Sequence, residues 1–212
     1  NSILSGDTGI IFAGDDTAII YKARNWEGRG VDEPDTEAVV RGSREGFVET
    51  ININTSLLRR RIKSPFLRLE AMKIGRETQT TVVIAYLEGI ANQQIVTEVK
   101  TRLNKIDTDS ILESGYLEQY IEDSPFSIFP TISNSEKPDV VAAKILEGRI
   151  AILTDGTPFV LLAPYLFIES FQATEDYYSR PYYASLLRLL RFSAALITAF
   201  APAVYVAVVS FH

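Results

Sequence analysis

The last twenty residues before His212 contain no charged side chain. The segment 192–211 reads FSAALITAFAPAVYVAVVSF, and as an α-helix it is roughly 30 Å long, about the thickness of a bilayer's hydrocarbon core. A buried core helix is the alternative, but uncharged runs of about 20 residues are long for soluble cores. Pro202 is compatible with a helix in lipid, where side chains such as Thr198 bond to backbone carbonyls. We therefore predict one transmembrane helix at 192–211.

The residues before this run predict an interfacial segment at 181–191. Tyr182 and Tyr183 are aromatic side chains of the kind enriched at membrane–water interfaces. Asn1 is not followed by the charged and cleavable apolar segments typical of a secretory leader, and we expect the sequence to be a piece of a longer membrane protein, cut at both ends. The positive-inside rule then predicts that the preceding domain faces the cytoplasm. The arginines on which this prediction depends are Arg180, Arg188 and Arg191.

Upstream of residue 181, segments with helical and with strand patterns alternate. Thr80–Leu87 is apolar on both faces, which predicts an interior strand covered by helices. The alternation of helices with hairpins predicts an α/β fold, a mixed β-sheet flanked by helices, followed by one C-terminal transmembrane helix. The other predicted strands are 67–71, 150–153 and 159–162, and the predicted helices are 52–63, 95–106, 109–121 and 138–148.

Local signals set the boundaries of these elements. Asp109-Ser110 followed by Glu113 resembles a capping box that opens a helix. Pro138 is typical of a first helical position, and Gly148 of the residue just past a helix end. Two β-rich runs, 8–13 and 17–23, predict an N-terminal hairpin. We predict that 1–30 is a hairpin or the end of a preceding subdomain, and that 31–180 is the cytoplasmic α/β domain.

The residue types needed for most enzyme chemistry are missing. The chain has no Cys, and its single His is His212, which excludes thiol nucleophiles, Cys-based metal sites and a Ser–His–Asp triad. It also lacks a phosphate-binding P-loop motif. Asp15-Asp16 could bind a cation, but a hairpin tip explains the pair better. We predict no enzyme activity, no cofactor and no metal, and the net charge of -6 argues against a nucleic-acid partner.

A basic band interrupts this acidic chain. Between Arg41 and Arg76 there are nine Lys or Arg residues and three acidic ones, whereas the remainder holds 12 basic and 24 acidic residues. Such a band can contact anionic headgroups, an acidic surface of a neighbour or RNA, and RNA ranks last because the band lacks interleaved exposed aromatic residues. A solvated helix end, where cations favour the C-terminal dipole, explains the arginines at 59–61 equally well.

Motifs around this band resemble a known family. They are Glu33-Pro34, EAVVRGSREGF at 37–47 and NTSLLRRRI at 54–62, followed by YLEGIAN at 86–92, LEGRIAI at 146–152, DGTP at 155–158 and Phe171-Gln172. Together they cover nearly the whole chain. On these motifs the chain resembles the A-subunit family of spore germinant receptors, the GerA-type spore germination proteins, over the N-terminal region and the first transmembrane helix.

The resemblance implies a non-enzymatic membrane subunit of a nutrient-germinant receptor in endospore-forming bacteria. It implies that germinant binding is transduced to germination and ion release by an oligomeric receptor or channel. The implied partners are a transporter-like B subunit, a lipoprotein C subunit, membrane lipid and further copies of this chain. The implied location is the inner spore membrane or cell membrane, with the domain facing the spore core. The alternative is that the domain itself binds the small-molecule germinant.

Two hypotheses name site residues. In the first, ion pairs of Arg41, Arg44 and Glu45 hold a glycine-rich turn and join one subunit to the next, or the domain to the membrane mouth. Gly42 and Gly46 supply positive φ or close backbone approach there, and Arg59, Arg60 and Arg61 belong to the same surface. A salt-bridge network within the domain is the alternative. In the second, an interfacial collar transmits domain motion to the membrane helix, with simple anchoring as the alternative. Its residues are Tyr177, Tyr178, Tyr182, Tyr183, Arg188 and Arg191.

Overall fold

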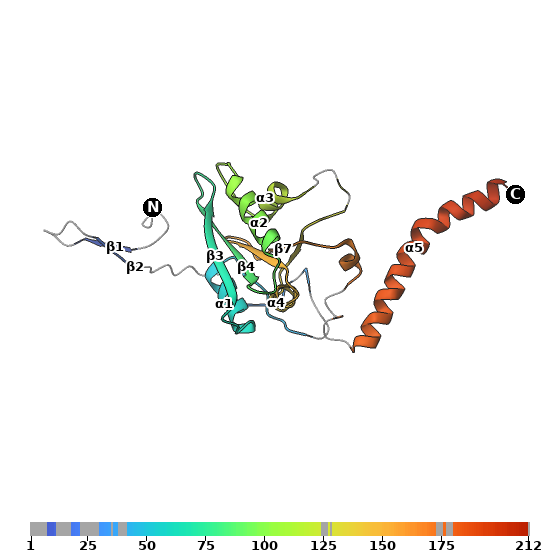
Figure 1. Cartoon of the computed structure of the whole chain (residues 1–212), viewed down its shortest axis with the longest axis horizontal. Helices are drawn as coiled ribbons and strands as arrows, with labels where there is room; N and C mark the ends of the chain where they lie inside the picture. The colour runs from blue at the N-terminus through green and yellow to red at the C-terminus, as the bar shows by residue number, and fades with distance from the viewer. Residues whose placement is uncertain are drawn as a thin grey trace.

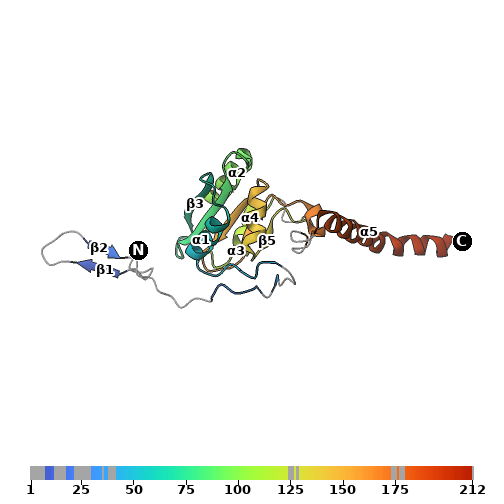
Figure 2. The ribbon, with the colours of Figure 1, turned by 90° about the horizontal axis from the view of Figure 1, so that it is seen from below.

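The computed structural model describes residues 8–11, 18–21, 30–34, 36–37, 42–123, 127, 129–172, 176 and 180–211. A five-stranded sheet forms the middle layer of the domain, and a long helix extends away from it (Figures 1 and 2). Its strands are β3 (Leu67–Ile74), β4 (Thr80–Leu87), β5 (Ser133–Ser135), β6 (Ile150–Thr154) and β7 (Val160–Ala163). The helices are α1 (Ile51–Arg61), α2 (Gln93–Lys105), α3 (Ser114–Ile121), α4 (Pro138–Leu146), the 3₁₀ helix η2 (Phe167–Phe171) and α5 (Pro181–Phe211).

The expected α/β class, a sheet with flanking helices and a C-terminal apolar helix, is confirmed, but every pair of neighbouring strands is antiparallel rather than mixed. The strand order is β3-β4-β6-β7-β5. The crossover through α4 does bring β6 back parallel to β5, as in a βαβ unit. However, the β6–β7 hairpin inserts β7 between these two strands, so that each of them pairs with an antiparallel neighbour.

Helices cover both faces of the sheet, and the side chains of β4 alternate between the two helix layers. Val83, Ala85 and Leu87 of β4 face α1 and α4 in one buried cluster. Val82, Ile84 and Tyr86 face α2 and α3 in the other. Because successive side chains of a strand point to opposite faces, a strand buried in both clusters must be apolar throughout. The prediction that 80–87 is an interior strand is therefore confirmed.

The helix ends follow their local signals with one exception. α4 begins at Pro138, and Gly148 has φ +92° just beyond its end, as predicted. The predicted capping box at 109–113 is wrong. Helix α3 begins at Ser114, and its N-cap is Glu113, whose side chain accepts a hydrogen bond from the backbone N–H of Gly115. Asp109 does not cap this helix, and its carbonyl accepts hydrogen bonds from the backbone N–H groups of Glu77 and Thr78 in the β3–β4 turn.

α5 runs without interruption through the predicted interfacial and membrane segments. It has 31 residues, and among the described residues it is the single helix that is long and apolar enough to cross a membrane. From Ala194 to Ser210 every described side chain is exposed, so no other part of the described chain covers this surface. Figure 1 shows that the helix changes direction along its length, and Pro202 within it lacks the N–H that an uninterrupted helix uses. The two strands β1 (Thr8–Ile11) and β2 (Ala18–Tyr21) pair antiparallel as the predicted hairpin.

Candidate interfaces at the 42–46 loop and the base of α5

The loop 42–46 is fixed to the domain through its glycines. The N–H of Gly46 donates to the carbonyl of Asp32 at 2.9 Å. A Cβ at Gly46 would lie 2.8 Å from that oxygen and 2.9 Å from Cγ of Pro34, so no larger residue fits. Gly42 has φ +145°, which residues with a side chain rarely adopt. The next residue, Phe47, is fully buried in the core and ties the loop to the domain.

Glu45 connects this loop to the end of α1. Its Oε2 accepts a hydrogen bond from Nη2 of Arg61 at 2.8 Å, and its Oε1 accepts one from Arg60. The hydroxyl of Ser43 also accepts from Arg61, at 2.7 Å. The hydrogen bond and charge of Arg60, together with Arg61, lower the pKa of Glu45 below its usual value. These side chains are partly solvated, and each ion pair therefore contributes at most about 1 kcal/mol.

The other predicted arginines lie apart from this ion pair. Arg44 is 77% exposed, and its only ion pair within the described residues is a distant one to Glu33, at 3.6 Å. Arg59 is exposed on α1 and forms no ion pair with any described side chain. Arg41 lies outside the described residues. The structure thus brings Glu45, Arg60 and Arg61 together and leaves two cations, Arg44 and Arg59, facing solvent.

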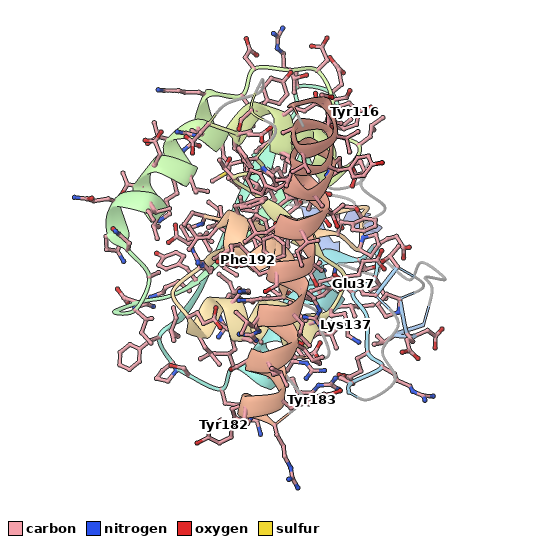
Figure 3. The ribbon with its side chains drawn as sticks, turned by 90° about the vertical axis from the view of Figure 1, so that its right-hand side faces the viewer. Glu37, Tyr116, Lys137, Tyr182, Tyr183 and Phe192 are labelled. Carbon is pink, nitrogen blue, oxygen red and sulfur yellow. The ribbon has the colours of Figure 1, made fainter. Side chains whose placement is uncertain are left out.

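A buried lysine beneath the loop was missed by the sequence analysis. Lys137 is fully buried, and its Nζ donates to the carbonyl of Ser43 at 2.8 Å. Nearby, Glu37 accepts from the hydroxyl of Ser135 at 2.8 Å, and burial raises the pKa of Glu37. Figure 3 shows Glu37 and Lys137 on the same side of the domain. Hydropathy could not reveal this lysine, because a buried and an exposed lysine look alike in a polar connector.

The base of α5 is held by a buried carboxylate. The side chain of Asp176 is 1% exposed and accepts hydrogen bonds from Arg188 at 3.1 Å and from Arg191 at 2.8 and 3.2 Å. Arg191 also donates to the carbonyl of Phe171 at 3.1 Å. Two of the predicted collar residues therefore bind the domain. Asp176 was not singled out from the sequence, because its pairing depends on the folding of α5 against η2.

Aromatic rings extend this contact into the domain. The rings of Phe171 and Phe192 meet edge to face, with centroids 5.3 Å apart. Phe167 continues the series at 5.5 Å from Phe171, and Phe129 lies 4.9 Å from Phe167. Edge-to-face pairs add roughly 0.5–1.5 kcal/mol beyond burial. The series therefore links the loop before β5, η2 and α5.

The two described tyrosines of the predicted collar are exposed. Tyr182 is 92% and Tyr183 57% exposed, at the first turn of α5, and Figure 3 shows both at the lower end of the helix, with Phe192 farther along it. Tyr177 and Tyr178 lie outside the described residues. The collar as a whole is therefore a mixed set: its arginines pair with Asp176 and its described tyrosines face outward.

A groove lies on the face of the sheet that α2 and α3 cover. It has a volume of about 440 Å³ and an apolar floor that includes Ile95, Val99 and Ile132. At its rim, Arg102 pairs with Glu98 at 2.7 Å and with Asp123 at 2.5 Å. Among the described residues, no three His, Asp or Glu side chains lie close enough to hold a metal ion. The groove thus combines an apolar floor with a charged rim and has the size of a small-molecule pocket.

The chain is similar to proteins of spore germination along its whole length. Spore germination protein KA of Bacillus subtilis (strain 168) is 49% identical over 212 residues, all of this chain and 39% of the relative. The membrane protein YfkQ of the same strain is 44% identical over 211 residues, all of this chain and 41% of the relative. The chain spans about two fifths of the length of these relatives.

A solved structure and a family model complete the comparison. The N-terminal domain of the A subunit of the Bacillus megaterium spore germinant receptor GerK3 is 59% identical, with a TM-score of 0.47, over 57% of this chain and 96% of that one. The model of the family described as Bacillus/Clostridium GerA spore germination protein matches residues 1–212. The resemblance read from the motifs is thereby confirmed, and the chain belongs to the GerA spore germination protein family.

Proposed function

We propose that this chain belongs to the A subunit of a nutrient-germinant receptor and transmits germinant binding to the membrane without catalysing a reaction. The membership of the GerA family supports a role in germination, and the candidate transmembrane helix supports membrane association. The observation that carries the transmitting role is the pair of buried carboxylates at η2 and just beyond it. Each of them is held by two cations from a different part of the fold.

The first carboxylate, Glu169, ties η2 to the sheet domain. Its Oε2 accepts from Lys144 at 2.8 Å, and its Oε1 pairs with Arg149. The side chain of Glu169 is 7% exposed. Lys144 lies in the last turn of α4, and Arg149 directly precedes β6. A displacement of α4 or β6 is therefore transferred to η2, because removing one partner from a buried ion pair is strongly unfavourable.

The second carboxylate, Asp176, ties the segment after η2 to α5 through Arg188 and Arg191. Between the two carboxylates, the ring of Phe171 contacts Phe192. Domain motion can thus reach α5 through consecutive side-chain contacts, from Glu169 through Phe171 and Phe192 and from Asp176 through the two arginines. This arrangement favours transmission over simple anchoring, for which the apolar helix alone would suffice.

The proposal includes the assembly. Arg44 on the fixed 42–46 loop and Arg59 in the last turn of α1 are both exposed cations, which suits an acidic surface of a neighbouring copy. The B and C subunits are the other proposed partners, and channel formation follows from a closed oligomer of α5 helices. The proposed location is the inner spore membrane or cell membrane, with the domain in the spore core.

Asp176→Asn in the full receptor tests the transmitting role. The substitution keeps the size of the side chain and removes the charge that holds Arg188 and Arg191. We expect the receptor to reach the membrane at normal abundance and the nutrient-triggered germination rate to fall at least tenfold. Glu88→Gln is the matched control, because Glu88 forms an exposed pair with Arg68 on the far edge of the sheet. A normal germination rate in Asp176→Asn would overturn the proposal.

The groove supports a second candidate, a domain that itself binds the germinant. Its volume suits a molecule of amino-acid or sugar size. Calorimetry of the chain with nutrient amino acids and sugars tests it, with Val99→Trp to fill the groove. Heat that disappears in Val99→Trp favours binding there, and no heat over a wide concentration range rejects it.

A further inference from the structure

Beside the base of α5, helix η2 and the residue before it present consecutive large apolar side chains to solvent. Leu166 is 52%, Phe167 49% and Ile168 55% exposed. Phe129, 50% exposed, meets Phe167 edge to face and enlarges the same surface. Single exposed apolar residues are ordinary, but a contiguous apolar surface of this kind marks a site of interaction. We call these four residues the η2 patch.

The position of the patch relative to the membrane segment follows from the aromatic contacts. Phe167 contacts Phe171, and Phe171 contacts Phe192, with centroid distances of 5.5 and 5.3 Å. Phe192 is the first residue of the uncharged run, and from Ala194 onward the described side chains of α5 are exposed. The patch therefore lies beside the point where α5 leaves the domain and its apolar span begins.

The orientation of the patch is fixed as well. Glu169 follows Ile168 directly, and its buried carboxylate is held by Lys144 and Arg149. At the other end of η2, the carbonyl of Phe171 accepts from Arg191 of α5. Because both ends are tied, the side chains at 166–168 cannot turn inward without breaking buried ion pairs.

We propose that the η2 patch inserts into the interfacial region of the lipid bilayer, beside α5, and forms a second contact of the domain with the membrane. Lipid is the occupant that fits, since the patch is continuous through Phe171 and Phe192 with the part of α5 that is uncharged and exposed from Ala194 to Ser210. Phe, Leu and Ile are the side chains with which protein segments anchor at the boundary of headgroups and acyl chains. The domain would then lie at a set height and tilt on the membrane. This inference rests on the membrane placement of α5 in the proposed function.

The absence of cysteine from the chain permits a direct test with single nitroxide labels. The full chain is placed in nanodiscs of phosphatidylcholine and phosphatidylglycerol, and each label's collision rates with oxygen and with a polar nickel chelate are compared. Ile168→Cys probes the patch. Leu112→Cys is the matched control, because Leu112 is also an exposed apolar residue, at 63%, but lies by the β6–β7 turn at the opposite end of β7. Ile197→Cys reports on the span.

We expect the oxygen-to-nickel ratio at Ile168 to exceed that at Leu112 by about threefold or more and to fall below that at Ile197. Equal ratios at Ile168 and Leu112 would overturn the inference while leaving the membrane placement of α5 intact. A label at Ile168 that neither reagent reaches would indicate a protein partner instead of lipid and would also overturn it. A water-like ratio at Ile197 would remove the membrane placement of α5, and both proposals with it.

Discussion

The carboxylate of Asp176 and the guanidinium of Arg191 form a two-point ion pair at the base of α5, with Nη1 to Oδ2 at 2.8 Å and Nη2 to Oδ1 at 3.2 Å. The planar guanidinium matches both oxygens of a carboxylate, which fixes the direction of the helix as well as its position. Arg188 adds a third hydrogen bond from the preceding turn of the helix. The base of α5 is therefore attached to the domain by three side-chain hydrogen bonds to one buried carboxylate.

Removing both arginines should release α5 from the domain. In Arg188→Ala/Arg191→Ala, the carboxylate of Asp176, which is 1% exposed in the wild type, loses its ion pairs with both arginines. Because the arginines are themselves partly solvated, we expect local stability to fall by about 2–3 kcal/mol rather than by the full cost of a buried ion pair. Hydrogen exchange in η2 and the first turns of α5 measures this. Unchanged exchange, topology and germination would contradict both the transmitting and the anchoring role of these residues.

Charge reversal at Arg44 should weaken assembly without affecting the fold. Arg44 is 77% exposed, and its one ion pair with a described side chain is a long one to Glu33, so Arg44→Glu is expected to change the free energy of unfolding by less than about 0.5 kcal/mol. We expect the mass of the purified full-length assembly in detergent to decrease. Lys73→Glu on the exposed side of β3 is the control. A large drop in melting temperature would instead assign Arg44 a structural role.

Gly46→Ala should destabilise the domain through a steric clash. The added Cβ would lie 2.8 Å from the carbonyl oxygen of Asp32, and 2.9 Å from Cγ of Pro34. Because backbone must shift to relieve the first contact, we expect a loss of about 2–3 kcal/mol, measured by chemical denaturation. Gly30→Ala in the same N-terminal segment is the control, since its Cβ would lie 3.4 Å from a flexible carboxylate. Equal stability of the two variants would show that the loop moves freely.

The ion pair of Glu45 should make stability depend on acid pH. Hydrogen bonds and charge from Arg60 and Arg61 lower its pKa in the folded state below the ordinary value of about 4.3. This stabilisation is present above the unfolded-state pKa and is lost as the pH falls through the lowered folded-state pKa. The difference in unfolding free energy between the wild type and Glu45→Gln should therefore shrink in acid.

Glu37 is the internal contrast in the same experiment. Burial raises its pKa in the folded state. The free energy of unfolding is therefore higher at low pH, where Glu37 is protonated, and decreases as the pH rises through the interval between the unfolded and folded pKa values. The difference between the wild type and Glu37→Gln should thus change with pH in the opposite sense to that of Glu45→Gln. Parallel pH profiles for the two variants would contradict the assignments.

Elements that depend on neighbours in the sequence were predictable. The apolar run at 192–211 forms part of α5 because a helix satisfies its own backbone hydrogen bonds. The interior strand at 80–87 and the hairpin formed by β6 and β7 follow from apolar periodicity and turn residues. The family motifs at 37–47 and 54–62 also needed no structure. Because these motifs are read from the sequence alone, the 42–46 loop and the end of α1 could be predicted as candidate sites without a structure.

Interactions between distant segments were decided by the tertiary structure. Whether β6 pairs with β5 or with β7 depends on the hairpin that inserts between them, and a βαβ pattern alone favours the wrong, parallel pairing. Glu113 rather than Asp109 caps α3, because the carbonyl of Asp109 accepts hydrogen bonds from the β3–β4 turn.

The uncharged run at 192–211 determined by itself that this protein has a helix suited to a membrane. Only the fold determined how that helix is joined to the domain, because Asp176 and Glu169 are ordinary acidic residues in the sequence. Their burial, and hence the strength of their pairing with Arg191 and Lys144, arises when η2 packs against α5 and α4. The free energy of an ionised carboxylate depends on its desolvation and on nearby cations, and neither can be inferred from the residues next to it in the sequence.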